Sequence, residues 1–340
     1  MIRFVRTTLM FAAVASIATA ATAADITGAG SSFVEPVMAR WSADYNKITG
    51  DRVNYQANGS GAGIAAIKAG TVDFGASDQP LNSADLASAG LVQFPIVIGG
   101  ILPVMNLPGV AAGKLHFTGA LLADVFMGRV TKWNDPAIAR ANPGMKLPDS
   151  AIVVVHRADS SGTTFNLTHY LGQVSQPWKS GPGEGKTVNW PANSIGGKGN
   201  AGVAQSVKQT ANAIGYVEYA YVVENKMTYA LVANADGKYV QPGAASFAAA
   251  ASRAPWERAS DFNLVMTNAP GAGAWPITAS TFVLVHRHAS ADKVATAAAA
   301  MKFFRWTMAK GQPQAAALNY VALPPALVKR VDAYLAANVK

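Results

Sequence analysis

The chain has 340 residues, of which 50% are hydrophobic and 14% charged, with no cysteine and a net charge of +9. This composition excludes a disordered chain, and the length favours two lobes. The lack of cysteine excludes disulfides, cysteine-based zinc sites and thiol nucleophiles. The positive charge suits an anionic ligand, but the lysines and arginines are scattered singly, which argues against a nucleic-acid surface.

The first residues are typical of an export signal. A short basic start with Arg3 and Arg6 leads into apolar residues 9–20 and then into Ala21-Thr22-Ala23. This pattern predicts a signal peptide over residues 1–23, cleaved near Ala23-Ala24. An uncleaved anchor helix is the alternative, which the short apolar run disfavours. Without cysteine the chain is not a lipoprotein, so we expect a freely soluble, exported protein.

Strands and helices alternate from residue 25 onward. A helix is predicted over residues 33–48, because Val37, Trp41, Tyr45 and Ile48 follow helical spacing. A strand at 53–55, a helix at 64–69 and a strand at 72–76 follow. This β–α–β–α order predicts an α/β domain with a largely parallel sheet.

A second α/β region is expected after Pro108. Its predicted elements are a strand at 152–155, a helix at 165–171 and a strand at 213–217, with loops over 175–199. Residues 94–107 are expected to form buried strands, residues 281–285 a further strand, and the alanine-rich residues 244–251 a surface helix. Near the carboxyl end we expect one helix capped by Ser290 and ended by Gly311, and another starting at Pro324-Pro325.

Three predicted helix starts carry hydroxyl groups and glycines. They are Ser32-Phe33, Gly59-Ser60-Gly61 and Ser161-Gly162-Thr163. Free backbone N–H groups at a helix start attract anions, and glycine lets the backbone approach a ligand closely. In open α/β sheets such junctions converge beyond the strand ends, so we expect the three to share one anion. Taken singly, each serine could equally be a helix cap.

Charged residues near these starts refine the expected ligand. Arg157 offers a planar fork of donors suited to phosphate. Asp78 is unexpected, because a carboxylate repels an anion that has no proton to donate. Phosphate keeps a proton at neutral pH and sulfate does not, so Asp78 would favour phosphate. Asp159 is expected to orient Arg157, and on its own Asp78 could be a turn residue before Pro80.

An ordered series of motifs runs along nearly the whole chain. They are Thr27-Gly28-Ala29-Gly30-Ser31-Ser32-Phe33, Val53-Asn54-Tyr55-Gln56, Val72-Asp73-Phe74-Gly75-Ala76-Ser77-Asp78, Gln93-Phe94-Pro95, Arg157-Ala158-Asp159, Gly196-Gly197-Lys198-Gly199-Asn200, residues 213–219 and Trp275-Pro276-Ile277-Thr278. In this order they resemble the periplasmic phosphate-binding proteins of ABC-type phosphate importers.

The resemblance implies a two-lobed periplasmic-binding-protein fold of type II, each lobe a mostly parallel sheet flanked by helices. Lobe I would comprise residues 24–106 and 276–340, and lobe II residues 107–275, with the ligand in the cleft between them. It implies a periplasmic, monomeric protein without catalytic activity or cofactor, whose ligand is inorganic phosphate and whose partner is a membrane permease.

By position, the resemblance assigns phosphate contacts to Ser32, Phe33, Ser60, Asp78, Arg157, Ser161, Gly162 and Thr163, with Asp159 supporting Arg157. Two residues depart from the family pattern. Ser32 stands where threonine is frequent, which keeps the hydroxyl. Ser160 stands where glycine is common, so a side chain must fit that turn.

These residues also allow other interpretations. The segment Gly185-Lys186-Thr187 resembles the end of a nucleotide P-loop. Only three residues separate Gly181 from Gly185, where a P-loop needs four, and no predicted strand precedes the segment. A hydrolase could combine Ser160 or Ser161 with Asp159 and with His156 or His169, but no Gly-x-Ser-x-Gly motif surrounds either serine. His286 and His288 are expected at a solvated strand end rather than in a metal site. A binding protein for another tetrahedral oxyanion stays open, with Asp78 as the discriminating residue.

Overall fold

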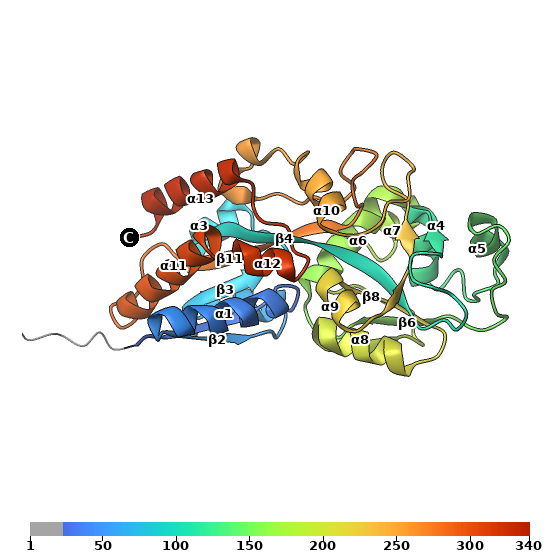
Figure 1. Cartoon of the computed structure of the whole chain (residues 1–340), viewed down its shortest axis with the longest axis horizontal. Coiled ribbons are helices and arrows are strands. Elements are labelled where there is room, and N and C mark those ends of the chain that lie inside the picture. The colour runs from blue at the N-terminus through green and yellow to red at the C-terminus, as the bar shows by residue number, and fades with distance from the viewer. Residues whose placement is uncertain (1–22) are drawn as a thin grey trace, which may run out of the picture.

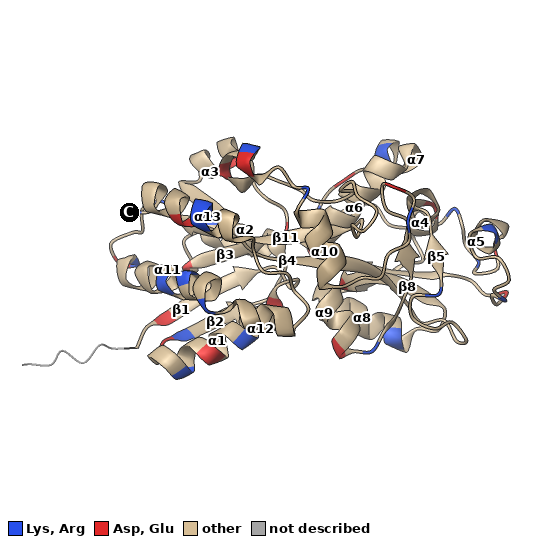
Figure 2. Ribbon diagram, turned by 45° about the horizontal axis from the view of Figure 1, so that its top comes forward, with Lys and Arg blue, Asp and Glu red and all other residues tan. Residues whose placement is uncertain are grey.

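The computed structural model describes residues 23–340, so the predicted signal peptide lies almost wholly outside the described residues. The described chain forms two halves joined by long strands (Figure 1). Acidic and basic residues are spread over both halves rather than gathered in one block (Figure 2). No helix in residues 23–340 is both long and apolar enough to cross a membrane.

The amino-terminal half begins with parallel strands. Its elements are β1 (Asp25–Gly30), α1 (Glu35–Thr49), β2 (Arg52–Gln56), α2 (Ser60–Lys68), β3 (Phe74–Ser77) and α3 (Ser83–Ser88). Strand β1 pairs in parallel with β2 and with β3, as the sequence predicted. Helix α1 buries Val37, Trp41 and Tyr45 on the predicted face. Ile48 was wrongly placed on that face: it is 66% exposed at the helix end.

Two strands organise the centre of the nine-stranded sheet. Its order is β2-β1-β3-β11-β4, followed by β8 (Ala213–Glu218), β6 (Val153–Arg157) and β7 (Ile195–Gly197), with β9 (Thr228–Tyr229) also paired to β4. Strand β4 (Leu91–Met105) is buried at every residue, which explains its mainly apolar sequence. It pairs antiparallel with β11 (Thr278–His286) along its first part and with β8 (Ala213–Glu218) along its second. Strand β4 therefore runs from one half into the other (Figure 1).

The middle of the chain builds the other half. Its elements are β5 (His116–Phe117), α4 (Gly119–Phe126), α5 (Pro136–Ala141), β6 (Val153–Arg157), α6 (Gly162–Val174), α7 (Gln176–Ser180), β7 (Ile195–Gly197), α8 (Gly199–Gln209), β8, α9 (Tyr219–Glu224), β9 (Thr228–Tyr229), β10 (Leu231–Val232) and α10 (Ala244–Ala251). Strand β6 pairs in parallel with β7 and β8. The stretch predicted as loops over 175–199 thus contains a short helix and a strand.

Helix α10 is not simply a surface helix. Phe247 and Ala250 are fully buried, and the Phe247 ring packs edge-on against Trp275 and Tyr219. The alanine-rich composition conceals this face, because Phe247 is the one large apolar residue of the segment.

The carboxyl-terminal residues return to the amino-terminal half. After the short 3₁₀ turns Trp256–Arg258 and Ser260–Phe262, β11 leads to α11 (Val294–Ala309), α12 (Gln312–Ala317) and α13 (Pro325–Asn338). Helix α11 begins after Lys293, and Ser290 does not cap it as predicted. Helix α13 buries Leu327, Val331 and Leu335.

The predicted lobe bounds of 24–106 with 276–340 and of 107–275 remain a prediction. One segment crosses these bounds. Residues 256–262 fall within predicted lobe II, yet they contact lobe I. The Ala259 carbonyl accepts a hydrogen bond from Arg330, and the Asp261 carboxylate accepts one from Tyr334.

Candidate anion-binding site

The predicted site residues lie where the two halves face each other. They follow the ends of β1, β3 and β6 or begin α2 and α6. The loops at the ends of parallel strands are where an α/β sheet usually presents ligand contacts. Hydrogen bonds join these loops across the halves, as from the Gly61 N–H to the Ser160 carbonyl at 2.9 Å.

Asp78 is a buried carboxylate just after β3. It is 2% exposed and accepts hydrogen bonds of 2.6 Å from the hydroxyls of Ser31 and Thr281. Burial raises the pKa of Asp78 to about 6, although hydrogen bonds from Ser31 and Thr281 and the charge of Arg157 act in the opposite direction. With this pKa the carboxylate is mostly ionised at neutral pH, so it can accept a hydrogen bond from a protonated ligand.

The start of α2 meets the start of α6 through the hydroxyl of Ser60. Its Oγ accepts the backbone N–H of Gly162 at 3.1 Å and that of Asp78 at 3.2 Å. A Cβ atom at position 162 would lie 2.5 Å from Ser60 Oγ and 2.7 Å from Asp78 Cβ. Gly162 is therefore what allows the halves to approach this closely.

Arg157 is held rigidly at the end of β6. The residue is 4% exposed, and its Nε and Nη2 atoms donate to the two carboxylate oxygens of Asp159 at 2.8 Å and 2.5 Å. Its Nη1 atom donates to Thr163 Oγ1 at 3.1 Å. Burial would raise the pKa of Asp159, but the Arg157 guanidinium and the Gly199 N–H together lower it. The predicted role of Asp159 in orienting Arg157 agrees with this geometry.

Asn200, at the start of α8, was not among the predicted site residues. It is fully buried, and both its backbone N–H and its side-chain amide donate to Ser32 Oγ, at 2.9 Å and 3.0 Å. The same amide donates to Thr163 Oγ1 at 3.2 Å, and its oxygen accepts the Glu218 N–H. The signal for Asn200 was present, because it follows a strand and begins a helix after glycines, as the three predicted loops do.

Three hydroxyl groups of the site share one property. Ser32, Ser60 and Thr163 each accept two N–H hydrogen bonds, from the donors given above. A hydroxyl oxygen has two acceptor lone pairs and one O–H donor. With both lone pairs engaged, each group has only its O–H left to offer. These hydroxyls are therefore prepared to donate to an anion.

The contacts close into a ring. Asp78 bonds Ser31, whose neighbour Ser32 bonds Asn200. Asn200 bonds Thr163, whose neighbour Gly162 bonds Ser60, and Ser60 bonds Asp78. Arg157 reaches the ring through Thr163. This ring of hydrogen-bonded residues contains one carboxylate and several donors, and its residues come from both halves.

Two predicted contact residues already have partners. The Phe33 N–H donates to Ser31 Oγ at 3.0 Å, so Ser31 links that N–H to Asp78. Ser161 caps α6, because its hydroxyl accepts the Thr164 N–H at 3.0 Å. The O–H of Ser161 is not used in that bond. Ser31 and Thr281 were missed from the sequence, since Thr281 joins Asp78 only through the pairing of β11 with β3.

The loop with a partial P-loop pattern packs beside the ring. Its Lys186 carbonyl accepts the Ser161 N–H at 3.0 Å, and its Lys186 ammonium donates to the Gln79 side chain at 2.6 Å. No strand leads directly into this loop, so it lacks the context of a nucleotide site.

The residues of the alternative hydrolase are not assembled into a triad. His156 Nδ1 lies 2.9 Å from the Arg157 carbonyl, and His169 Nδ1 lies 2.6 Å from Thr267 Oγ1. Asp159 is engaged by Arg157. Among residues 23–340, no hydrogen bond joins either histidine to Ser160 or Ser161. The geometry therefore lacks the nucleophile–base contact of a hydrolase.

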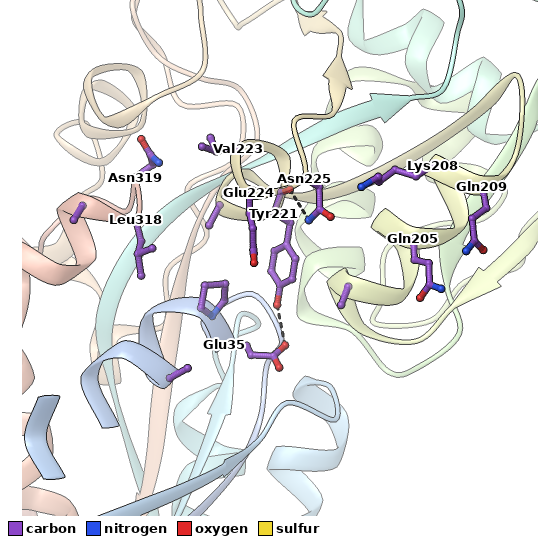
Figure 3. Close-up of a pocket in the computed structure, with 15 residues that line it drawn as sticks. Glu35, Gln205, Lys208, Gln209, Tyr221, Val223, Glu224, Asn225, Leu318 and Asn319 are labelled. Atoms are coloured by element: carbon purple, nitrogen blue, oxygen red, sulfur yellow. Dashed lines mark hydrogen bonds between the residues drawn. The ribbon is translucent and has the colours of Figure 1, made fainter. Parts of the chain in front are cut away.

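A cleft of about 940 Å³ also lies between the halves (Figure 3). It is lined by α1, α8, α9 and the end of α12. Inside it the Tyr221 hydroxyl donates to the Ser32 carbonyl at 2.7 Å and lies 2.9 Å from a carboxylate oxygen of Glu35. Tyr221 thus ties the backbone of a ring residue to the opposite half.

Comparison with known proteins adds independent information. A family model described as a PBP superfamily domain matches residues 15–310. A phosphate-binding protein PstS of Xylella fastidiosa is 56% identical over 315 residues, covering 93% of this chain and 86% of that protein. The phosphate-binding protein PstS of Haemophilus influenzae is 46% identical over 320 residues, covering 94% of this chain and 95% of that protein.

A solved structure has the same fold. The phosphate-binding protein from Stenotrophomonas maltophilia aligns with a TM-score of 0.70 at 21% identity, covering 92% of this chain and 93% of that chain. This match confirms the predicted α/β fold of the periplasmic-binding-protein kind.

Proposed function

The chain belongs to the PstS family of phosphate-binding proteins within the PBP superfamily, and from this premise we propose that it captures inorganic phosphate between its halves for import. An ABC-type permease would receive the anion and supply the coupling to ATP. This chain would perform no chemistry and need no cofactor. We place it in the periplasm after removal of residues 1–23, as an unanchored monomer.

One observation supports phosphate above other anions. The ring of contacts offers several donors and a single buried carboxylate, Asp78, whose pKa is raised to about 6. A phosphate that keeps a proton can donate it to Asp78, whereas a fully deprotonated sulfate would set two acceptors against each other. Specificity against a ligand lacking one polar group is large when buried partners are left unpaired.

We assign the direct phosphate contacts to both halves. Ser32, Phe33, Ser60 and Asp78 would act from one side, and Arg157, Ser161, Gly162 and Thr163 from the other. Asp159 and Asn200 would position these groups, as their hydrogen bonds to Arg157, Ser32 and Thr163 suggest. The geometry supports these roles because all of these residues lie on or beside one ring.

Replacing Arg157 tests the proposal. We expect Arg157→Ala to weaken phosphate binding more than 100-fold in titration calorimetry, because removing one member of a buried charge pair costs about 3–5 kcal/mol. Arg157→Lys keeps the charge but loses the planar fork, and should weaken binding less. The exposed Arg140→Ala is the matched control and should bind as the wild type does.

Unchanged affinity in folded Arg157→Ala protein would remove Arg157 from the site. Turnover of a phosphomonoester by the purified wild type would replace the proposal by the hydrolase alternative. Circular dichroism of each variant separates loss of binding from loss of folding.

A further inference from the structure

A second pocket lies at the outer end of the amino-terminal half. Its volume is about 550 Å³, within the range usual for small-molecule sites. It is formed by the end of α2, the residues before β3, the end of β11, helix α11 and the last two residues. Thr281, which bonds Asp78, and His286, which lines this pocket, are five residues apart on β11, so about 17 Å separates the two sites along the strand.

The floor of this pocket is apolar. Its apolar lining residues are Val72, Val285, Val294, Ala297, Ala298, Met301 and Val339. Val294 is 56% exposed, one of few large apolar side chains left open to solvent in the described chain. An apolar surface that remains accessible in a concave site is suited to a hydrocarbon group.

The rim of the pocket is basic. Its cationic or titratable side chains are Lys68, His286, His288, Lys293, Lys302, Arg305 and Lys340. Blue segments mark the basic residues of α11 in Figure 2. Lys68, Lys302 and Arg305 form no ion pair with an acidic residue of the described chain. Their charges are available to a ligand.

The single acidic side chain that lines the pocket is already engaged. Asp73 accepts hydrogen bonds from Thr27 and Thr296, at 2.8 Å and 2.6 Å, and pairs with Lys293 at 3.4 Å. It therefore does not neutralise the rest of the rim. The histidine pair that the sequence suggested at a solvated strand end thus lies beside an apolar hollow, with lysines and an arginine around it.

We propose that this pocket binds a single-chain amphiphile with an anionic head group, such as a medium-chain carboxylate. The hydrocarbon chain would lie on the floor between β11 and α11. The head group would pair with Lys302, Arg305 and Lys68 at the rim. This site is separate from the phosphate site and does not depend on the function proposed above.

Titration calorimetry with decanoate tests the proposal on the mature protein saturated with phosphate. We expect saturable binding of one decanoate. Octanoate should bind about fifteenfold more weakly, because it lacks two buried methylenes and each contributes roughly a fourfold change in affinity. Decanol, which lacks the charge, should also bind at least tenfold more weakly than decanoate.

Two pairs of variants locate the site. Ala297→Trp fills the pocket and should reduce decanoate affinity at least tenfold, whereas Ala295→Trp, on the exposed side of the same helix, should not. Lys302→Glu combined with Arg305→Glu should reduce the affinity similarly, whereas the exposed Lys329→Glu should not. Phosphate binding should be unchanged in all of them.

Several results would overturn the proposal. They are an absence of saturable decanoate binding, equal affinity for decanol, and wild-type affinity in folded Ala297→Trp protein. Decanoate binding that appears only after phosphate is removed would assign the binding to the central site instead.

Discussion

Neighbouring N–H donors determine what the hydroxyl groups near Asp78 can offer to a ligand. Ser32, Ser60 and Thr163 each receive two N–H bonds, so only their O–H groups stay free for a ligand. Such preorganisation lowers the cost of ordering side chains on binding. Asp78 is the one carboxylate among the ring residues, and this contrast underlies the expected preference for a protonated anion.

The ionisation of Asp78 should make the ligand-free protein less stable at higher pH. Its pKa of about 6 in the folded chain lies above the unfolded value of 3.8, so the folded state binds the proton more tightly. This contribution to stability is complete below pH 3.8 and is lost as the pH rises through about 6. Between pH 5 and pH 8 the loss should be about 1.4 kcal/mol.

Urea unfolding of wild type and Asp78→Asn in phosphate-free buffer measures this loss. The free energy of unfolding should fall by that amount more in the wild type than in the variant. The exposed Asp332→Asn should follow the wild type. Identical pH profiles for wild type and Asp78→Asn would show that Asp78 has no raised pKa.

Residues that contact the ring from distant parts of the chain were the hardest to predict. Ser32, Ser60 and Ser161 stand at helix starts, a pattern that a sequence displays locally. Thr281 bonds Asp78 from 203 positions away, and only the antiparallel pairing of β11 with β3 brings it there. Asn200 has the local sequence pattern of a helix start, but the sequence does not reveal that it bonds Ser32, because Ser32 lies in the other half.

At the level of elements, most residues of the predicted site lie at or just before the first turns of helices. Helix α6 shows this most clearly. Its first residue, Gly162, lies against Ser60 and Asp78 of the other half, while its cap Ser161 fixes where the helix begins. Helices and strands with clear periodicity were predicted well. The errors concern end effects such as the Ser290 cap, and α10, which buries Phe247 and Ala250 although it was predicted as a surface helix.

Adding one methyl group at Gly162 should disturb binding more than folding. The Cβ of Gly162→Ala would overlap Ser60 Oγ and Asp78, so we expect phosphate affinity to fall at least tenfold. Gly172→Ala lies in the same helix with no atom within 4 Å of the new Cβ. It should bind normally and gain up to about 1 kcal/mol of stability from helix propensity.

Calorimetry and thermal unfolding of both variants check this prediction. Equal phosphate affinity for Gly162→Ala and Gly172→Ala would show that close approach at α6 is not needed for binding.

For the whole molecule, β4 and β11 form the connection about which the halves could move. Contacts across the gap include Gly61 with Ser160, Lys186 with Gln79, and Tyr221 with Glu35. The α/β class followed from the alternation of strands and helices, and the return of the chain to its first half was implied by the family resemblance. The packing of residues 256–262 against α13 was not predicted, because it depends on single tertiary contacts such as the hydrogen bond from Arg330 to the Ala259 carbonyl.

We expect phosphate to draw the halves together. An anion held by groups of both halves favours the closed arrangement, because only there do all the contacts form. Small-angle X-ray scattering should show a smaller radius of gyration after phosphate is added to stripped wild type, and no change for Arg157→Ala at the same concentration. An unchanged radius for the wild type would indicate that the halves do not close on the ligand.

The central claim is that this fold selects a protonated tetrahedral anion through Asp78. Titration calorimetry of the refolded mature chain with phosphate and with sulfate tests it most directly. The account predicts saturable binding of one phosphate and at least 100-fold weaker binding of sulfate, since the sulfate complex would leave two buried acceptors unpaired. Comparable affinities for the two anions would contradict it.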